Sequence, residues 1–292
     1  MTGTAEYEQV TQIRMSRELD GKPVYWVSAY LADGLLIDTG CSHTSGELAS
    51  FLEGRGLRAA VNTHYHEDHM GGNHDIMDRY GVDIYSHPIS VPLIANRFEL
   101  YPYQEIAWGY PVPTTVRPVP DVVETEHHAF QVVETPGHCT GHICLFEPSK
   151  GWCFTGDLFA RENPKFIRPE ENVGEIMKSM RKVMDLPTDR LVLFTAVGKI
   201  VEDGRKALGR CIDYFMDLAA KVHMLHLAGL TIEETMQREF GGEHPFAQLT
   251  NNQFSTENLV RSLLETVPAE ISGGIRSCED TGKGERKRLR PS

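Results

Sequence analysis

The sequence predicts an α+β protein, with a mixed α/β part up to about residue 200 and an all-helical part after it. Short apolar, β-branched segments alternate with helical patterns over the first two hundred residues, and long helical patterns follow from Ala207. Hydrophobic residues make up 40% and charged residues 24% of 292 residues, which is ordinary for a globular protein with a substantial core.

The first part opens with strands. The segment 23–31 is β-branched and aromatic, and Asp33-Gly34 is a hairpin-turn signal before the apolar segment 35–37. The elements predicted up to residue 200 are strands 23–31 and 35–37, helix 47–54, strand 58–62, helix 75–80, strand 82–85, helix 90–97, strands 130–134, 143–147 and 152–155, helix 173–184 and strand 191–194.

The segment 98–120 is rich in proline and aromatic residues, and its prolines argue against regular structure. Its aromatic side chains either cap a binding pocket or form a homodimer contact, and the sequence leaves both open.

Three helical patterns, 207–227, 231–240 and 256–264, make up the last third, and Gly229-Leu230 before Thr231 fits a helix stop followed by an N-cap. We therefore expect a mixed α/β domain over 1–204 and a helical domain over 205–270 that packs on it. A disordered tail is expected over 271–292, where hydrophobic residues become scarce.

The composition also limits the partners. A net charge of -12 disfavours nucleic acid and anionic membranes, since an acidic chain repels phosphate groups at long range. No run of about 18 apolar residues occurs, and the polar segment 1–10 is unlike a secretory signal. Six cysteines without C-x-x-C spacing indicate buried thiols in a reducing compartment. We expect a cytoplasmic protein that acts on a small molecule.

Four side chains of metal-ligand type occur within six residues: His64, His66, Asp68 and His69. Residues two apart in an extended segment point to the same side, so His64 and His66 project together after strand 58–62. A histidine-rich loop arising by chance is the alternative. The apolar residues before the cluster argue against it, and the following glycines supply the backbone freedom that such a turn needs.

Two further candidates follow later strands. His138 ends the segment 136–138, and Asp157 ends the segment 155–157, so each lies where a strand gives way to a loop. A single histidine is more often structural than a ligand. Together with the first cluster, His138 and Asp157 complete a predicted metal site.

The chain resembles the metallo-β-lactamase superfamily over about residues 10–200. The matching runs, in order, are Ile37-Asp38-Thr39-Gly40, Thr63-His64-Tyr65-His66-Glu67-Asp68-His69, Thr135-Pro136-Gly137-His138 and Thr155-Gly156-Asp157. The resemblance implies a four-layer αββα sandwich with one or two metal ions at the edge of the sheets. The helical end resembles the C-terminal domain of lactamase-like proteins close to the glyoxalase II group.

The resemblance also implies a ligand set. The first metal is held by His64, His66 and His138, and the second by Asp68 and His69, with Asp157 as the bridge. The family usually has one more histidine after the last strand, and here Val197 stands at that position. Valine cannot bind a metal, so we expect a weakened second site. His223 and His226, in the long helix, are expected to face solvent or core, with reach into the site as the alternative.

The implied chemistry is hydrolytic. Three neutral imidazoles suit zinc, with iron or manganese as alternatives, and leave a coordination position open for water. A bound metal lowers the pKa of water towards about 7 and yields a metal-bound hydroxide, which Asp68 orients as the catalytic residue while shuttling its proton. Asp38 is expected to support the site from behind or to form a turn. Cys139 and Cys41 are either nucleophiles or packed side chains.

The expected function is hydrolysis of a small ester, thioester or lactone. One alternative is an oxidoreductase that resembles the single-iron persulfide dioxygenases. Another is a metal- or ligand-binding protein that has lost its catalysis. An RNA nuclease is disfavoured by the acidic charge and by the lack of a long insertion between Asp157 and Val197.

Overall fold

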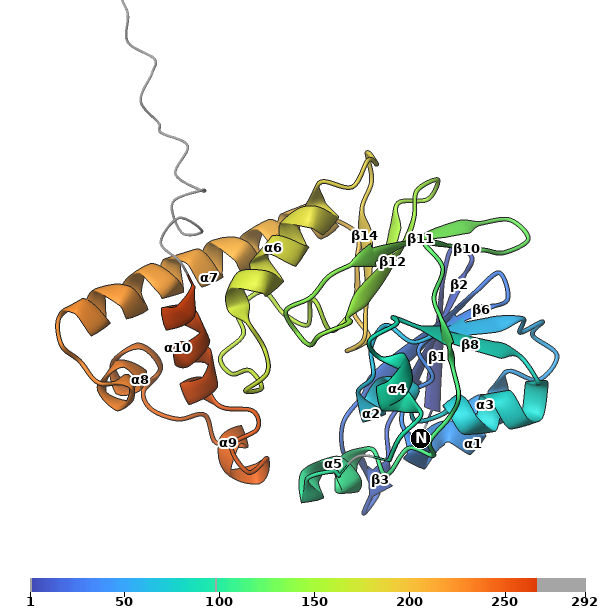
Figure 1. Ribbon diagram of the computed structural model, residues 1–292, viewed down its shortest axis with the longest axis horizontal. Coiled ribbons are helices and arrows are strands. Elements are labelled where there is room, and N and C mark those ends of the chain that lie inside the picture. Colours follow the sequence, from blue (N-terminus) through green and yellow to red (C-terminus); the bar gives the residue numbers. More distant parts are fainter. Residues whose placement is uncertain (1, 98, 267–292) are drawn as a thin grey trace, which may run out of the picture.

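Two β-sheets that face each other form the centre of the molecule (Figure 1). The computed structural model describes residues 2–97 and 99–266. In spatial order, the first sheet contains β1 (Thr2–Tyr7), β2 (Val10–Met15), β5 (Val27–Ala32), β6 (Leu35–Ile37), β7 (Ala59–Val61), β8 (Asp83–Ser86) and β9 (Arg117–Pro118). The second contains β10 (Val122–Glu124), β11 (Ala129–Glu134), β12 (Ile143–Glu147), β13 (Trp152–Gly156), β14 (Val192–Thr195) and β15 (Ile200–Val201). A small separate hairpin pairs β3 (Glu18–Leu19) with β4 (Lys22–Pro23).

Alternating side chains divide the core into three apolar layers. In β12, Leu145 faces the other sheet, whereas its neighbour Phe146 faces the helices on the outside. In β5, Tyr30 faces the space between the sheets and Ala29 faces the opposite side. This two-residue period buries both faces of each sheet, so the predicted four-layer αββα sandwich is confirmed.

The helices lie on the outer faces of the two sheets (Figure 1). Before the second sheet come η1 (Ser42–Thr44), α1 (Ser45–Phe51), α2 (Glu67–Met70), α3 (Asn73–Tyr80), α4 (Val91–Ile94) and α5 (Pro102–Ala107). Then follow α6 (Val173–Met184), α7 (Gly204–Leu227), α8 (Ile232–Phe240), α9 (Phe246–Leu249) and α10 (Thr256–Glu265). None of the helices in the described ranges has both the length and the apolar character needed to cross a bilayer.

The C-terminal helices share a core with the second sheet. Leu193 of β14, Met177 of α6, Leu208 of α7 and Leu263 of α10 belong to one apolar cluster. The division at residue 204 stays a prediction, although α7 does begin at Gly204. The expected disordered tail, 271–292, lies outside the described residues.

Most of the predicted elements lie within a few residues of their expected positions, whereas β1 and β2 were not predicted. The expectation that 98–120 lacks regular structure is wrong, because β9 and a short helix lie in it. A short helix, α5, occupies Pro102–Ala107 inside it. Proline is tolerated in the first turn of a helix, where its missing N–H would have no partner, so Pro102 begins this helix rather than preventing it. The Gln104 side chain accepts a hydrogen bond from the Tyr101 backbone at 2.8 Å and closes the first turn.

The direction of the strands determines at which end of the sheets the candidate site lies. β6 and β7 are parallel, as are β13 and β14, so the loops after each pair leave the same end of their sheet. These loops begin at Asp38, Asn62, Asp157 and Ala196. They carry most of the candidate ligands, because loops at the carboxyl ends of strands can converge without disturbing the sheets.

Candidate metal centre

The loop after β7 and the short helix α2 bring four candidate ligands to the edge of the first sheet. His64 and His66 lie in the loop, and Asp68 and His69 lie in α2. All four side chains are buried. Buried imidazoles and carboxylates need partners, so the contacts of these side chains decide what the cluster can do.

Three imidazole nitrogens converge at one point. His66 Nδ1 lies 3.0 Å from His64 Nε2 and 3.0 Å from His138 Nε2. A single ring nitrogen carries either one proton or one lone pair, so hydrogen bonding alone serves only one of these two contacts well. Two sets of side chains place their ligand atoms within 4.8 Å of one another, as binding of one metal ion requires: His64, His66 and Cys139, and His64, His69 and Asp157.

The remaining ring nitrogens of His64 and His69 have partners that fix their orientation. His64 Nδ1 lies 3.1 Å from Thr63 Oγ1, which donates a hydrogen bond to Asp38 Oδ2 at 2.9 Å. His69 Nδ1 lies 2.7 Å from the same carboxylate. Protonated Nδ1 atoms leave the Nε2 lone pairs of both rings directed into the site. Asp38 therefore supports two candidate ligands from behind, as such outer partners do in metal sites.

Glu171 plays the corresponding part for His138, and the sequence analysis did not single it out. Its Oε2 lies 3.5 Å from His138 Nδ1, on the side of the ring away from His66. The backbone N–H of Arg168 donates a hydrogen bond to Glu171 Oε1 at 2.9 Å, which fixes the carboxylate.

A second group surrounds Asp157. Its Oδ1 lies 3.6 Å from His69 Nε2, and its Oδ2 lies 3.5 Å from His138 Nε2, so the carboxylate lies between the two groups. Asp68 Oδ2 lies 3.8 Å from His69 Nε2. Within the described chain, His69 Nε2 and Asp68 Oδ1 are buried without a hydrogen-bond partner. Unpartnered buried atoms at such a position fit a missing cation.

The pKa values of the candidate ligands shift in different directions. Burial lowers the pKa of His69, but Asp38, Asp68 and Asp157 outweigh this effect and raise it well above its usual range. Burial, and then the neighbouring positive charges, hold the pKa values of His64 and His66 well below their usual range, so both rings are neutral donors. Burial also lowers the pKa of His138, but Glu171 and Asp157 outweigh this effect and the net shift is upwards. Burial raises the pKa of Asp68 to about 6, with Glu67 and Asp157 adding to the effect and His69 opposing it.

His142 is a buried member of the cluster that the sequence analysis missed. Its ring centroid lies 5.1 Å from that of His64, and its Nε2 accepts a hydrogen bond from the Asp157 backbone N–H at 3.2 Å. Burial, and then the nearby His138, lower its pKa to about 3, so the ring is neutral. The only signal in the sequence was its place four residues after His138. His142 positions Asp157 rather than competing for the metal.

Gly156 shows how closely these parts pack. Its φ is +47°, and a Cβ there would lie 2.7 Å from Thr63 Oγ1 and 2.8 Å from His142 Nε2. A larger residue would push apart the two loops that carry the ligands, so glycine is required at this position.

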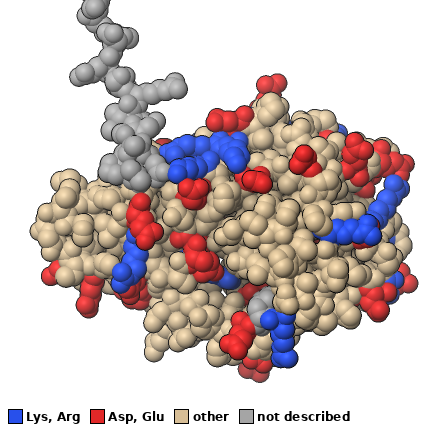
Figure 2. Space-filling view, in the orientation of Figure 1, with Lys and Arg blue, Asp and Glu red and all other residues tan. Residues whose placement is uncertain are grey.

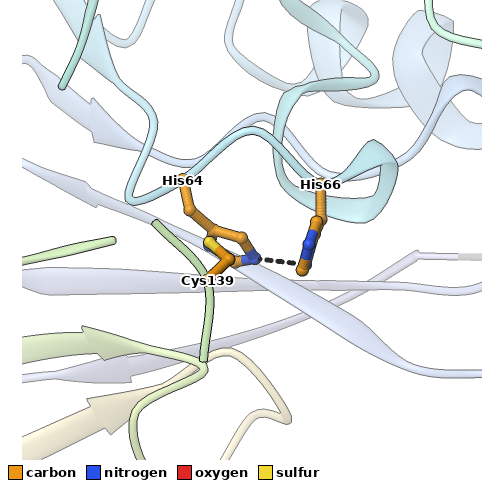
Figure 3. A group of neighbouring side chains, drawn as sticks. All are labelled: His64, His66 and Cys139. Carbon is orange, nitrogen blue, oxygen red and sulfur yellow. Dashed lines mark hydrogen bonds between the residues drawn. The ribbon is translucent and has the colours of Figure 1, made fainter. Parts of the chain in front are cut away.

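Cys139 belongs to the same cluster (Figure 3). Its Sγ, His64 and His66 offer ligand atoms that all lie within 4.8 Å of one another. Burial raises the pKa of this thiol, with Asp157 adding to the effect, so it is a poor nucleophile at neutral pH. The five cysteines that the structure describes, Cys139 among them, are buried and form no disulfide with one another.

A cavity of about 110 Å³ opens beside the cluster. Asp68, His138 and Asp157 form its inner wall, and Val197 also lines it. Val197, which we expect at the position of the family's usual last histidine, thus lines the cavity with an apolar side chain.

Other candidates lie elsewhere. His223 Nε2 contacts the Thr266 carbonyl at 3.1 Å, and His226 is exposed, so neither reaches the site.

Aromatic side chains line the cavity. In the 98–120 segment, Trp108 lines it, and the Tyr103 ring packs against the Trp108 ring with centroids 5.9 Å apart. Phe215 of α7 and Phe254 close the cavity from the helical part.

The residues present therefore fit one or two metal ions. They comprise convergent imidazoles, two carboxylates, buried atoms without partners and outer partners that orient the rings. Imidazoles with carboxylates are ligands that zinc, iron and manganese accept.

Comparison with known proteins agrees with this geometry. The model of the Metallo-beta-lactamase superfamily matches residues 26–195, more than half of the chain. Hydroxyacylglutathione hydrolase from Pelagibacter ubique (strain HTCC1062) is 28% identical over 132 residues, which cover 45% of this chain and 48% of that protein. The matches span about half the length of the curated relatives, between 44% and 64%.

Solved structures show the same fold. A beta-lactamase domain protein from Burkholderia ambifaria superposes with a TM-score of 0.69 at 17% identity, covering 90% of this chain and 88% of that chain. TTHA1623, crystallised in a di-iron-bound form, has a TM-score of 0.51 at 25% identity, covering 64% of this chain and 94% of that chain.

Proposed function

This chain belongs to the metallo-β-lactamase superfamily, and we propose that it is a metal-dependent hydrolase of a small ester, thioester or lactone. One observation carries the proposal: two groups of buried ligand atoms share Asp157 and open onto one cavity. The Pelagibacter relative, whose name describes a hydrolase of hydroxyacylglutathione, supports the same class of reaction.

His64, His66 and His138 would hold a divalent metal, which when bound supplies a Lewis acid and lowers the pKa of water at the site. The side chains around it would position the reaction. Asp38 and Glu171 fix the orientation of the rings, and buried Trp108 helps to keep bulk water out of the cavity.

Asp68 is the proposed proton carrier. Its carboxylate is buried, lines the cavity and has one oxygen without a partner among the described residues. With a pKa raised to about 6, the carboxylate is charged at neutral pH yet accepts a proton more readily than an exposed aspartate does. It would take a proton from the attacking water and return it to the leaving group.

Replacing Asp68 tests this role. Asp68→Asn keeps the shape but cannot accept a proton, so we expect kcat for thioester hydrolysis to fall by about 10²–10⁴-fold while the first metal is retained. Thiol release from S-acyl thioesters and elemental analysis provide the two measurements. Asp217→Asn, on the exposed side of α7, is the matched control. Full activity in Asp68→Asn would refute the assignment.

Val197 supports a second candidate. With a valine on the cavity wall, the second group keeps only Asp68, His69 and Asp157, and a single iron at the three histidines would suffice for a persulfide dioxygenase-like reaction. Iron in the purified protein together with oxygen uptake in the presence of a persulfide would favour this candidate over the hydrolase.

A further inference from the structure

Arg168 is a cationic side chain buried in the wall of the cavity. It lies on the loop between β13 and α6, is 5% exposed and lines the same cavity as Asp68 and His138. A guanidinium carries five N–H donors and no acceptor, so burial is costly unless those donors find oxygen atoms.

The protein supplies acceptors for only some of the N–H donors of this guanidinium. Its Nη2 lies 3.9 Å from Glu67 Oε1, and its Nη1 lies 3.9 Å from Glu170 Oε1, so both ion pairs are longer than hydrogen bonds. Glu67 Oε1 already accepts a hydrogen bond from Gln104 at 2.7 Å. Arg168 Nε is buried and has no partner among the described residues.

A second buried donor lies beside it. Trp108 also lines this cavity, and its Nε1 is buried and lacks a partner in the described ranges. The Arg168 guanidinium lies 5.9 Å from the Trp108 ring and 4.9 Å from the Phe254 ring, so aromatic faces bound it on two sides. Two unpartnered N–H donors facing one cavity require a ligand rich in acceptor oxygens.

The position of Arg168 is tied to the metal centre. Its backbone N–H donates to Glu171, the carboxylate behind His138. The preceding residue, Ile167, forms an isolated β-bridge with Ser255, next to Phe254. The guanidinium is therefore held at a fixed place relative to the ligands, as recognition of one particular group requires.

We propose that Arg168, assisted by Trp108 Nε1, binds a carboxylate of the substrate, so that the enzyme acts on small esters, thioesters or lactones that are anionic. The inference rests on the proposed hydrolase function and names its substrate class. Parallel N–H donors along one edge of a guanidinium match the two oxygens of a carboxylate.

The surrounding charges agree with this assignment. Arg161 and Lys165 are exposed and line the same cavity, so cations lead towards Arg168. Asp68, Asp157 and Glu171 also line the cavity; bound metal would neutralise the two aspartates, and Glu171 lies 3.5 Å from His138 Nδ1. Acidic side chains are spread over the face shown in Figure 2 rather than gathered in one patch, and the chain carries a net charge of -12. Attraction of an anion must therefore come from this local site.

A matched pair of probes tests the proposal on the metal-loaded protein. S-acetylthioglycolate and S-acetylthioglycolamide share one thioester and differ only in carboxylate against carboxamide. In the unmodified protein, kcat/KM should be higher for the acid. In Arg168→Lys and Arg168→Met, the ratio of the two kcat/KM values should fall by about 10- to 100-fold. Trp108→Phe, which keeps the ring and removes the N–H, should lower the ratio by a few fold.

Controls separate the buried site from general electrostatics. Lys221→Gln removes an exposed cation of α7 that does not line the cavity and should change the ratio less than threefold at about 0.15 M salt, because exposed charges are screened. If Arg168→Met leaves Glu67 unpaired and unfolds, the Glu67→Gln/Arg168→Met double variant replaces it. An unchanged ratio in the folded Arg168 variants overturns the proposal.

The experiments distinguish failure of the hydrolase proposal from failure of the carboxylate-binding proposal. If the metal-loaded protein cleaves neither probe, the hydrolase proposal falls, and calorimetric binding of succinate against succinamide then tests the anion site alone. Succinate binding that is weakened at least tenfold in Arg168→Lys supports the site. Equal binding by the unmodified protein and the variant refutes it.

Discussion

At the scale of single residues, the spacing of the ligands was predictable, and of their supporting side chains only Asp38 was. His64 and His66 are two residues apart, so the strand period predicts that they project together, and Asp68 and His69 follow in the next helical turn. His142, Glu171 and Arg168 come from loops whose meeting depends on how the two sheets face each other. No local pattern in a single sequence reports such a meeting.

The three-histidine group gives the first prediction at this scale. His66 Nδ1 is the nitrogen that contacts both other rings, so His66→Ala should lower the metal content of the purified protein several-fold. His226→Ala, on the exposed part of α7, should leave it unchanged. Elemental analysis of both variants provides the comparison, and equal metal content would show that the ion lies elsewhere.

Val197 gives the second prediction at the scale of single residues. An imidazole at this position of the cavity wall would restore the ligand usual in the family, and we expect Val197→His to tighten the second metal about tenfold or more, since even losses of outer partners cost 10–100-fold. Val197→Leu is the apolar control. Two tightly held metals already present in the unmodified protein would mean that another residue supplies the missing ligand.

At the scale of elements, the period of apolar residues predicted the longer helices and the central strands, but it did not predict β1, β2 or several short strands and helices. The prolines of 98–120 suggested an irregular segment, yet Pro102 lies in the first turn of α5. Composition records how many prolines a segment has. Whether each one meets a helix start or a helix interior depends on the capping groups around it.

The β5–β6 hairpin yields a pH-dependent prediction. Asp33 Oδ2 accepts the His127 backbone N–H at 2.6 Å, and Oδ1 lies 2.9 Å from His127 Nδ1. Burial opposes the charge of Asp33, but hydrogen bonds from Thr125 and His127 outweigh it and lower its pKa. The same carboxylate raises the pKa of His127.

The pH dependence of the stability follows from the directions of these two pKa shifts. The lowered pKa of Asp33 adds stability above about pH 4, which is lost as pH falls. The raised pKa of His127 adds stability below about pH 6.5, which is lost as pH rises through the folded-state pKa. Asp33→Asn should therefore lower Tm more at about pH 5 than at about pH 8. An equal loss at both pH values would mean that the charge pair contributes nothing.

At the scale of the whole molecule, the C-terminal helices complete both the core and the cavity. Leu208 and Leu263 share an apolar cluster with β14, and Phe215 lines the cavity. A chain that ends at Gly204 would expose this cluster to water, so we expect it to be insoluble or to lose its cooperative thermal transition. A chain that ends at Thr266 is the control. A soluble, active protein ending at Gly204 would contradict the prediction.

The β-bridge between Ile167 and Ser255 has a consequence for the order of events during synthesis. Asp157, the last candidate ligand in the sequence, is synthesised almost a hundred residues before Phe254, which bounds the Arg168 guanidinium. During synthesis, all the candidate ligands are therefore in the chain before the residue that completes the wall beside Arg168.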